Sequence, residues 1–212
     1  MSPYVLPHLH YPTLHWLLLW CGRCHGLSHH KKIRAFALAN HQDKKGTKNK
    51  PKKLKTLLLD ATEQEVTGSS REYYSGKKKR QTIKTEIIVE RQSGKIVQIS
   101  DPFPGRVHDI TMRRKSDPIP PSRSVYGDGG YQGMQKEHAN FKLPKRKPRG
   151  KPQTKEGLKH NKSHMAIRNL IERKFHEMKI FKILSHIYRN SKGSYAIKMA
   201  IIAGIVNFKN GF

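Results

Sequence analysis

A large excess of positive charge is the feature that most constrains how this chain can fold. The 212 residues include 43 Lys and Arg but only 15 Asp and Glu, which gives a formal net charge of +28. Leu, Ile, Val and Phe make up about 22% of the chain, just above the roughly 20% below which a highly charged chain is expected to be disordered. A core can therefore form only where apolar residues cluster. The charge predicts a polyanionic partner, either nucleic acid or an anionic membrane surface.

Membrane-spanning and disulfide-stabilised classes are not supported by the sequence. The longest apolar run, around Leu14–Cys21, stops after about eight positions, whereas a bilayer-spanning helix needs about 18–20. This run also lacks the cationic start and the cleavage site of a signal peptide. Cys21 and Cys24 are too few for a disulfide framework. We therefore expect a cytoplasmic protein that does not enter a membrane.

The chain changes character near residue 56. Met1–Asn40 sustains neither a helical nor a strand period, and Asp43–Lys55 is a lysine-rich stretch that repels itself and cannot bury surface. We interpret residues 1–55 as an irregular, basic segment that is disordered or truncated. Residues 56–210 form the expected folded domain.

Regular patterns within this domain predict a mixed α/β fold. Apolar and β-branched runs, with a turn at Ser93-Gly94, predict strands at Leu57–Asp60, Gln81–Arg91, Lys95–Ile99 and Ser124–Tyr126. Steps of four and three residues predict one long amphipathic helix with an apolar face of Ile167, Ile171, Phe175, Met178, Phe181 and Leu184. A second buried helix is expected at Tyr195–Phe208. With a connection through Val107–Lys115, the expected order is β-β-β-α-β-α…α.

Three of the scarce acids have positions that suit metal-assisted chemistry. Asp60 is expected to end the first strand, Asp128 to follow the fourth, and Glu172 to lie on the long helix. Strand ends are where α/β folds place ligands, and such carboxylates could hold two Mg²⁺ ions for phosphodiester chemistry. The structural alternative is a turn residue, a loop residue and a solvated Glu172 paired with Arg168, and spacing alone leaves it open.

Five segments of the chain carry motifs whose order is more specific than any one of them alone. They are Asp60–Glu65, Tyr73–Arg80, Gly105–Asp109, Gly127–Gly133 and the pattern Arg168-x3-Glu172-x6-Lys179. Together, from about Leu57 to Phe208, they resemble the catalytic domain of DDE transposases of bacterial insertion sequences, in the branch that is similar to Harbinger-type transposases.

The resemblance implies an RNase H-like mixed sheet flanked by helices. It also implies that Asp60, Asp128 and Glu172 hold two divalent ions, Mg²⁺ or Mn²⁺. The implied reaction is hydrolysis at a transposon end, which frees a 3′-hydroxyl that attacks target DNA. Met165 stands where the family often has a Tyr, and Asp109 is rated below Asp128 as a ligand because it precedes the fourth strand.

Basic residues supply the expected DNA contacts. The interpretation assigns phosphate contacts to Lys77, Lys78, Lys79, Arg80, Lys145, Arg168 and Lys179. The alternative is that the two basic runs, residues 77–80 and 142–151, are ordinary solvated loops. DNA ends, target DNA and a second copy of the chain are the expected partners.

Two further possibilities come from the rest of the sequence. A basic nucleic-acid-binding protein without catalysis is the main rival function. The pattern Cys21-x-x-Cys24-His25 formally fits haem attachment, and Cys21 and Cys24 with His29 or His30 formally fit zinc, but chance is the better explanation. Because residues 1–55 show no convincing helix-turn-helix, we interpret the chain as a truncated or frame-shifted copy that need not be active.

Overall fold

A computed structural model describes residues 56–68 and 70–212. The haem and zinc patterns and the segment 1–55 lie outside the described residues. Across the part that is described, none of the helices is both long and apolar enough to cross a bilayer.

The strands and helices follow the predicted order, with several short elements added. The strands are β1 (Thr56–Glu65), β2 (Tyr74–Ser75), β3 (Arg80–Glu90), β4 (Ile96–Ile99), β5 (Phe103–Pro104), β6 (Ser124–Tyr126) and β7 (Phe141–Lys142). The α-helices are α3 (Asp109–Lys115), α4 (Lys155–Lys179), α5 (Lys182–Ser185) and α6 (Tyr195–Lys209). Short 3-10 helices are η1 (Arg71–Tyr73), η2 (Gly129–Tyr131), η3 (Met134–Lys136) and η4 (Lys192–Ser194).

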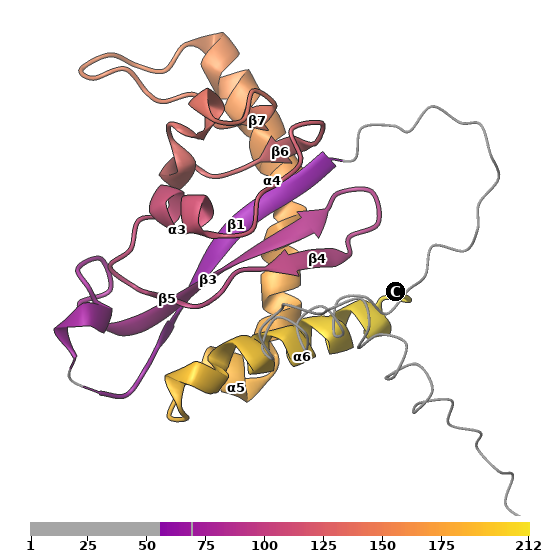
Figure 1. The fold of residues 1–212 in the computed structure, drawn as a ribbon. Helices are drawn as coiled ribbons and strands as arrows, with labels where there is room; N and C mark the ends of the chain where they lie inside the picture. The colour runs from indigo at the N-terminus through magenta and orange to yellow at the C-terminus, as the bar shows by residue number, and fades with distance from the viewer. Residues whose placement is uncertain (1–55, 69) are drawn as a thin grey trace, which may run out of the picture.

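The sheet is mixed, and β1 lies at its centre. β1 pairs with β3 in antiparallel fashion and with β6 in parallel, while β4 pairs antiparallel with β3 and β7 parallel with β6. Helices cover the sheet, with α4 running across it and α6 beside β4 (Figure 1). The predicted RNase H-like mixed α/β class is confirmed.

The first strand is longer than its apolar run predicts. Leu57 to Glu65 pair residue by residue with Glu90 to Thr82 of β3, so Asp60 lies in the middle of β1 and the prediction that it ends the strand is wrong. The polar half continues the ladder because its side chains find partners. The Thr82 hydroxyl donates to Glu63, and the Arg80 guanidinium donates to Glu65.

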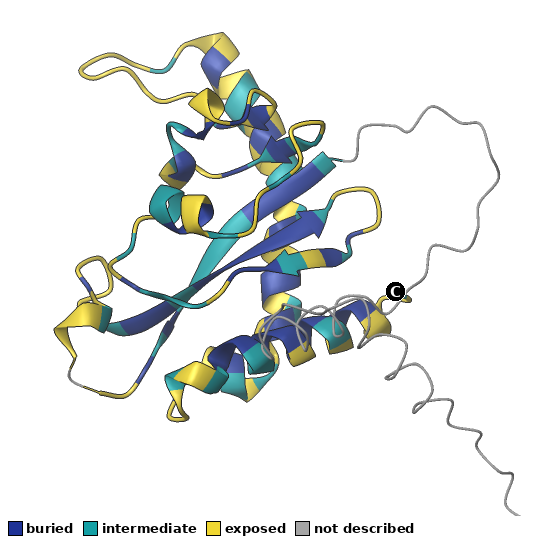
Figure 2. Cartoon of the chain, viewed as in Figure 1, coloured by how far each residue is buried: buried dark blue, intermediate teal, exposed yellow. Residues whose placement is uncertain are grey.

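Alternation along the strands builds two cores, one on each face of the sheet. Leu58 and Ile87 point to the face covered by α4 and α6, where Ile171, Phe175 and Met199 pack. Leu57, Leu59 and Ile88 point to the opposite face of the sheet. There they pack with Val125, Tyr131 and Phe141. Figure 2 shows that much of the central strands is buried, whereas the helices each carry an exposed side. Asp60 shares the face of Leu58 and therefore lies toward α4.

The long helix ends before its apolar pattern does. α4 begins after Thr154, whose side chain accepts from the Gly157 amide, and ends at Lys179. Phe181 has extended backbone angles, and Leu184 belongs to α5, so the single helix predicted through Leu184 is wrong. The break lets the same apolar spacing continue from a second helix. That helix is tied back to β1 because the Gln64 amide donates to the carbonyls of Ile183 and His186.

A buried ion pair joins α3 to the sheet. Glu86 of β3 and Arg113 of α3 are almost fully buried and form a salt bridge, and Arg113 also donates to the Asp117 carbonyl. The buried Tyr131 side chain lies next to Glu86, within hydrogen-bonding reach of its carboxylate. Burial raises the pKa of Glu86 to about 7, and Arg113 only partly offsets this shift.

Glu86 should therefore make folding stability depend on pH. The folded chain binds a proton at Glu86 more tightly than the unfolded chain, whose ordinary pKa is 4.5, so this stability is fully present below pH 4.5 and is lost as the pH rises toward 7. We expect Glu86→Gln to remove a pH-dependent contribution of about 3 kcal/mol, measured by urea unfolding between pH 4.5 and 7.5. The exposed Glu137, paired with Arg114, provides the control Glu137→Gln. Equal pH dependence in wild type and Glu86→Gln would contradict the assignment.

Candidate active site

Two aspartates come together because two parallel strands are in register. Asp60 lies within β1, and Asp128 follows β6 by two residues and begins the short helix η2. Leu58 pairs with Tyr126, so the same register continued by two residues puts Asp128 level with Asp60. The Gly-rich turn after β6 thus delivers one carboxylate beside the other.

Arg168 of α4 bridges the two carboxylates. Its Nη2 lies 2.7 Å from Asp60 Oδ2, and its Nη1 lies 3.2 Å from Asp128 Oδ1. The Arg168 side chain is 13% exposed, compared with 20% for Asp60 and 53% for Asp128. Asp60 also accepts a hydrogen bond from the Ala61 amide. The guanidinium fork therefore links strand, turn and helix at one point.

Burial is the largest influence on the pKa values of Asp60 and His164 at the Arg168 bridge. Burial raises the pKa of Asp60 above its ordinary value, Asp128 adds to the rise, and the charge of Arg168 opposes it. His164 lies one helical turn before Arg168, and its Nε2 lies 3.2 Å from the Lys142 carbonyl. Burial and the nearby Arg168 lower the pKa of His164, which favours a neutral ring.

Glu172 is placed near this point but not within it. It lies on α4 one turn after Arg168 and is exposed. Arg168 pairs with the two aspartates and not with Glu172, so the structural alternative of an Arg168–Glu172 pair is wrong. Among the described residues, no three His, Cys, Asp or Glu side chains gather closely enough to hold a metal ion. The structure thus brings Asp60 and Asp128 together and leaves Glu172 outside.

The predicted DNA contacts are spread over the domain. Lys77, Lys78 and Lys79 are exposed in the turn between β2 and β3, while Arg80 begins β3 and pairs with Glu65 at 2.5 Å. Lys145 is exposed after β7, and Asn161 of α4 fixes its backbone with two hydrogen bonds. These groups do not share one cluster with the aspartates.

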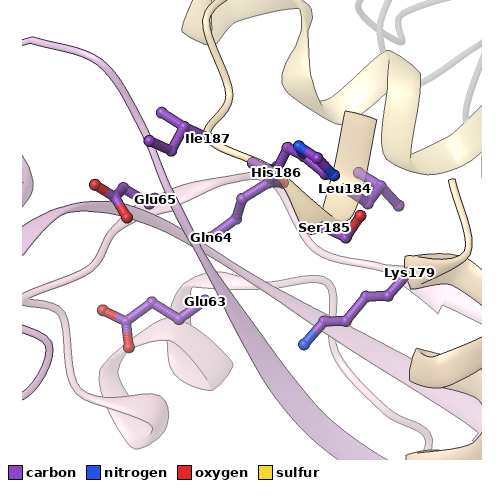
Figure 3. A pocket seen from close by; sticks show the side chains of 8 residues that line it. All are labelled: Glu63, Gln64, Glu65, Lys179, Leu184, Ser185, His186 and Ile187. Atoms are coloured by element: carbon purple, nitrogen blue, oxygen red, sulfur yellow. The ribbon is translucent and has the colours of Figure 1, made fainter. Parts of the chain in front are cut away.

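Lys179 ends α4 and borders a separate cleft. This cleft of about 420 Å³ lies between the second half of β1, the end of α4, and the end of α5 with the two residues that follow it. Figure 3 shows the Lys179 side chain extending into the space beside Glu63, with Ser185 and His186 above it. Nothing in the sequence predicted this cleft, because its walls come from segments more than a hundred residues apart.

Asp109 packs against the turn that follows Asp128. It begins α3, and its Oδ1 lies 3.1 Å from the Lys84 ammonium group. A Cβ added at Gly130 would lie 2.3 Å from Asp109 Oδ2, so the turn after Asp128 packs directly on this carboxylate. The low rank given to Asp109 as a ligand is untested. No local pattern predicted its partner Lys84.

The match to a known family decides which class of protein contains this site. Residues 59–207 match the family described as DDE superfamily endonuclease. This chain belongs to that family.

One curated relative is a longer protein than the region it shares with this chain. A probable transposase for the insertion sequence element IS702 from Microchaete diplosiphon is 30% identical over 180 residues. The alignment covers 83% of this chain and 64% of that protein, so the chain spans less than two thirds of the relative it matches. No solved structure gives a significant match.

The turn that contains Asp128 depends on Gly127. A Cβ at Gly127 would lie 2.6 Å from a ring carbon of the buried Phe141, whereas a Cβ at Gly129 would meet nothing within 4 Å. We therefore expect Gly127→Ala to destabilise the domain by about 1–3 kcal/mol through overpacking, with Gly129→Ala as the matched control near wild type. Chemical unfolding of the three proteins measures the difference. Equal stability of the two variants would show that the turn does not depend on this contact.

Proposed function

We propose that this endonuclease domain cleaves DNA at insertion-sequence ends and joins the freed 3′-hydroxyl to target DNA, as a transposase. The observation that carries the proposal is the pair Asp60 and Asp128, which a single cationic group already bridges at 2.7 and 3.2 Å. Membership of the endonuclease family and the likeness to a probable transposase support the reaction class.

Asp60 and Asp128 supply two of the oxygen ligands that a hard divalent ion needs. Asp60 and Asp128 offer carboxylate oxygens on one side of the sheet, and the position between them accommodates a positive charge. Endonucleases of this superfamily generally use divalent ions, and we propose two Mg²⁺ or Mn²⁺ ions, with Glu172 as the third carboxylate. When bound, such ions activate the attacking oxygen and stabilise the leaving oxygen.

The chain's own residues would hold and orient the DNA. Asp128 is half exposed and faces solvent, while Asp60 is buried under α4, so the scissile phosphate would approach from the Asp128 side. Lys77, Lys78 and Lys79, on the exposed turn, would neutralise backbone phosphates away from the reacting bond. Action on cytoplasmic DNA and assembly with a second copy remain predictions.

Plasmid nicking tests the proposed chemistry. The purified chain should nick supercoiled plasmid in Mn²⁺ or Mg²⁺ and not in EDTA. Asp60→Asn, Asp128→Asn and Glu172→Gln should each lower the rate by about 100-fold or more, because metal ions contribute several kcal/mol of transition-state stabilisation. Glu137→Gln, an exposed acid paired with Arg114, is the control and should nick at the wild-type rate.

Nicking in EDTA, or nicking that survives all three site substitutions, would contradict the proposal. DNA binding without nicking in either metal would favour the second candidate, a basic binding protein without catalysis. The net charge of +28 is the observation that favours this second candidate.

DNA affinity should fall steeply with salt. Each phosphate contact contributes about 0.9 to the slope of log affinity against log salt concentration, so replacing Lys77, Lys78 and Lys79 by Ala should lower that slope by about 2–3. The control removes the same charge at the exposed positions Arg91, Lys115 and Lys136 and should change the slope less. Equal changes in the two triple variants would show that the turn makes no particular contact. Fluorescence anisotropy with a labelled duplex measures both slopes.

A further inference from the structure

The positive charge of Arg168 is committed to the two aspartates. Both terminal nitrogens of its fork donate to them, and the side chain is 13% exposed. Its Nε is buried and has no hydrogen-bond partner within the described ranges. The end of the fork formed by the two terminal nitrogens therefore faces the aspartates rather than a DNA phosphate.

The bridge is tighter at one end than at the other. Asp60 is the more buried carboxylate and receives the shorter contact, 2.7 Å, with added support from the Ala61 amide. Asp128 is 53% exposed and receives the longer contact, 3.2 Å. Solvent ions therefore reach the bridge from the Asp128 side, where the arginine is held less firmly.

A divalent cation on the same carboxylate oxygens would compete with Arg168. Two positive groups that share these oxygens repel each other, and solvent screens this repulsion only partly because the Asp60 and Arg168 side chains are 20% and 13% exposed. Carboxylate oxygens are the ligands that hard divalent ions prefer, so an ion competes with the guanidinium for them. Arg168 lies on the same edge of α4 as Glu172 and Lys179, an edge that borders the apolar face of the helix.

We propose that Arg168 is a displaceable counter-ion: a divalent cation that binds Asp60 and Asp128 releases its guanidinium, which then contacts a DNA phosphate. This inference rests on the proposed function and adds a coupling between metal binding and DNA binding. An arginine fork suits a phosphate as well as it suits a carboxylate. By linkage, metal must strengthen DNA binding by the same factor by which DNA strengthens metal binding.

Metal titration tests the competition directly. Calorimetric titration of the full chain with Mn²⁺ should show about tenfold tighter binding to Arg168→Gln than to wild type, because the competing charge is gone. Arg168→Lys, which keeps the charge but loses the fork, should fall between them. Arg173→Gln, an exposed arginine on the outer side of α4, removes the same charge and should match wild type.

Thermal unfolding provides the folding control. In EDTA, Arg168→Gln should melt below wild type because two adjacent carboxylates lose their counter-ion, and Mn²⁺ should raise its melting temperature more than that of wild type. If Arg168→Gln fails to fold, Arg168→Lys still tests the proposal and should bind Mn²⁺ more tightly than wild type. Equal or weaker Mn²⁺ binding by the folded variants would overturn it.

DNA binding tests the second half of the proposal. With Asp60, Asp128 and Glu172 all intact, Mn²⁺ should strengthen binding to a short labelled duplex that lacks an insertion-sequence end, which the proposed reaction would not cut. This gain should be about fivefold or more larger with Arg168 present than with Arg168→Gln. An equal gain in both would overturn the release of Arg168 to phosphate.

The counter-ion inference and the proposed cleavage would be contradicted by different results. If wild type nicks plasmid in Mn²⁺ but Arg168→Gln binds Mn²⁺ no more tightly, the counter-ion inference is wrong and the proposed function stands. If wild type does not nick and Arg168→Gln still binds Mn²⁺ more tightly, the site binds a cation as inferred and the proposed cleavage is wrong.

Discussion

The structure depends on the pairing of β1 with a neighbour on each side. Its antiparallel ladder with β3 runs through the polar half of the strand, and its parallel pairing with β6 fixes the register that places Asp128 level with Asp60. Alternation along β1 then sends Leu58 and Asp60 to the face under α4 and their neighbours to the opposite core. A one-residue slip of this strand would exchange the two faces and remove the site.

Charge balance at the site follows from that placement. In the middle of β1 the Asp60 carboxylate loses contact with water, which disfavours its charged form. This burial raises the pKa of Asp60. Arg168 compensates for this burial by bridging Asp60 to the more exposed Asp128. In a chain with a net charge of +28, an arginine committed to two acids is a specific arrangement rather than a consequence of composition. Arg168 and Glu172 lie one turn apart on one edge of α4, so the helix that brings Arg168 to the aspartates places Glu172 one turn further along.

Much of this arrangement was predictable from local pattern. The strand Ser124–Tyr126, the hairpin at Ser93-Gly94 and the helix from Tyr195 follow from apolar runs and turn residues, and the motif order indicated the family. The polar extension of β1 was missed because its stability comes from cross-strand partners that are distant in sequence. The break after Lys179 was missed because apolar spacing continues through it. The Arg168 bridge and the buried Glu86–Arg113 pair have no local signal, since tertiary contacts alone create them. The assignment of Glu172 to the site remains a prediction.

Anomalous X-ray scattering from crystals of the full chain grown with Mn²⁺ tests most directly whether Asp60 and Asp128 form a cation site. In this site Arg168 is the counter-ion that the metal displaces. We expect an anomalous peak within coordination distance of one oxygen from each aspartate, with the Arg168 guanidinium moved away from both carboxylates. An anomalous peak at another site, or Arg168 still bridging the two carboxylates in saturating Mn²⁺, would contradict it.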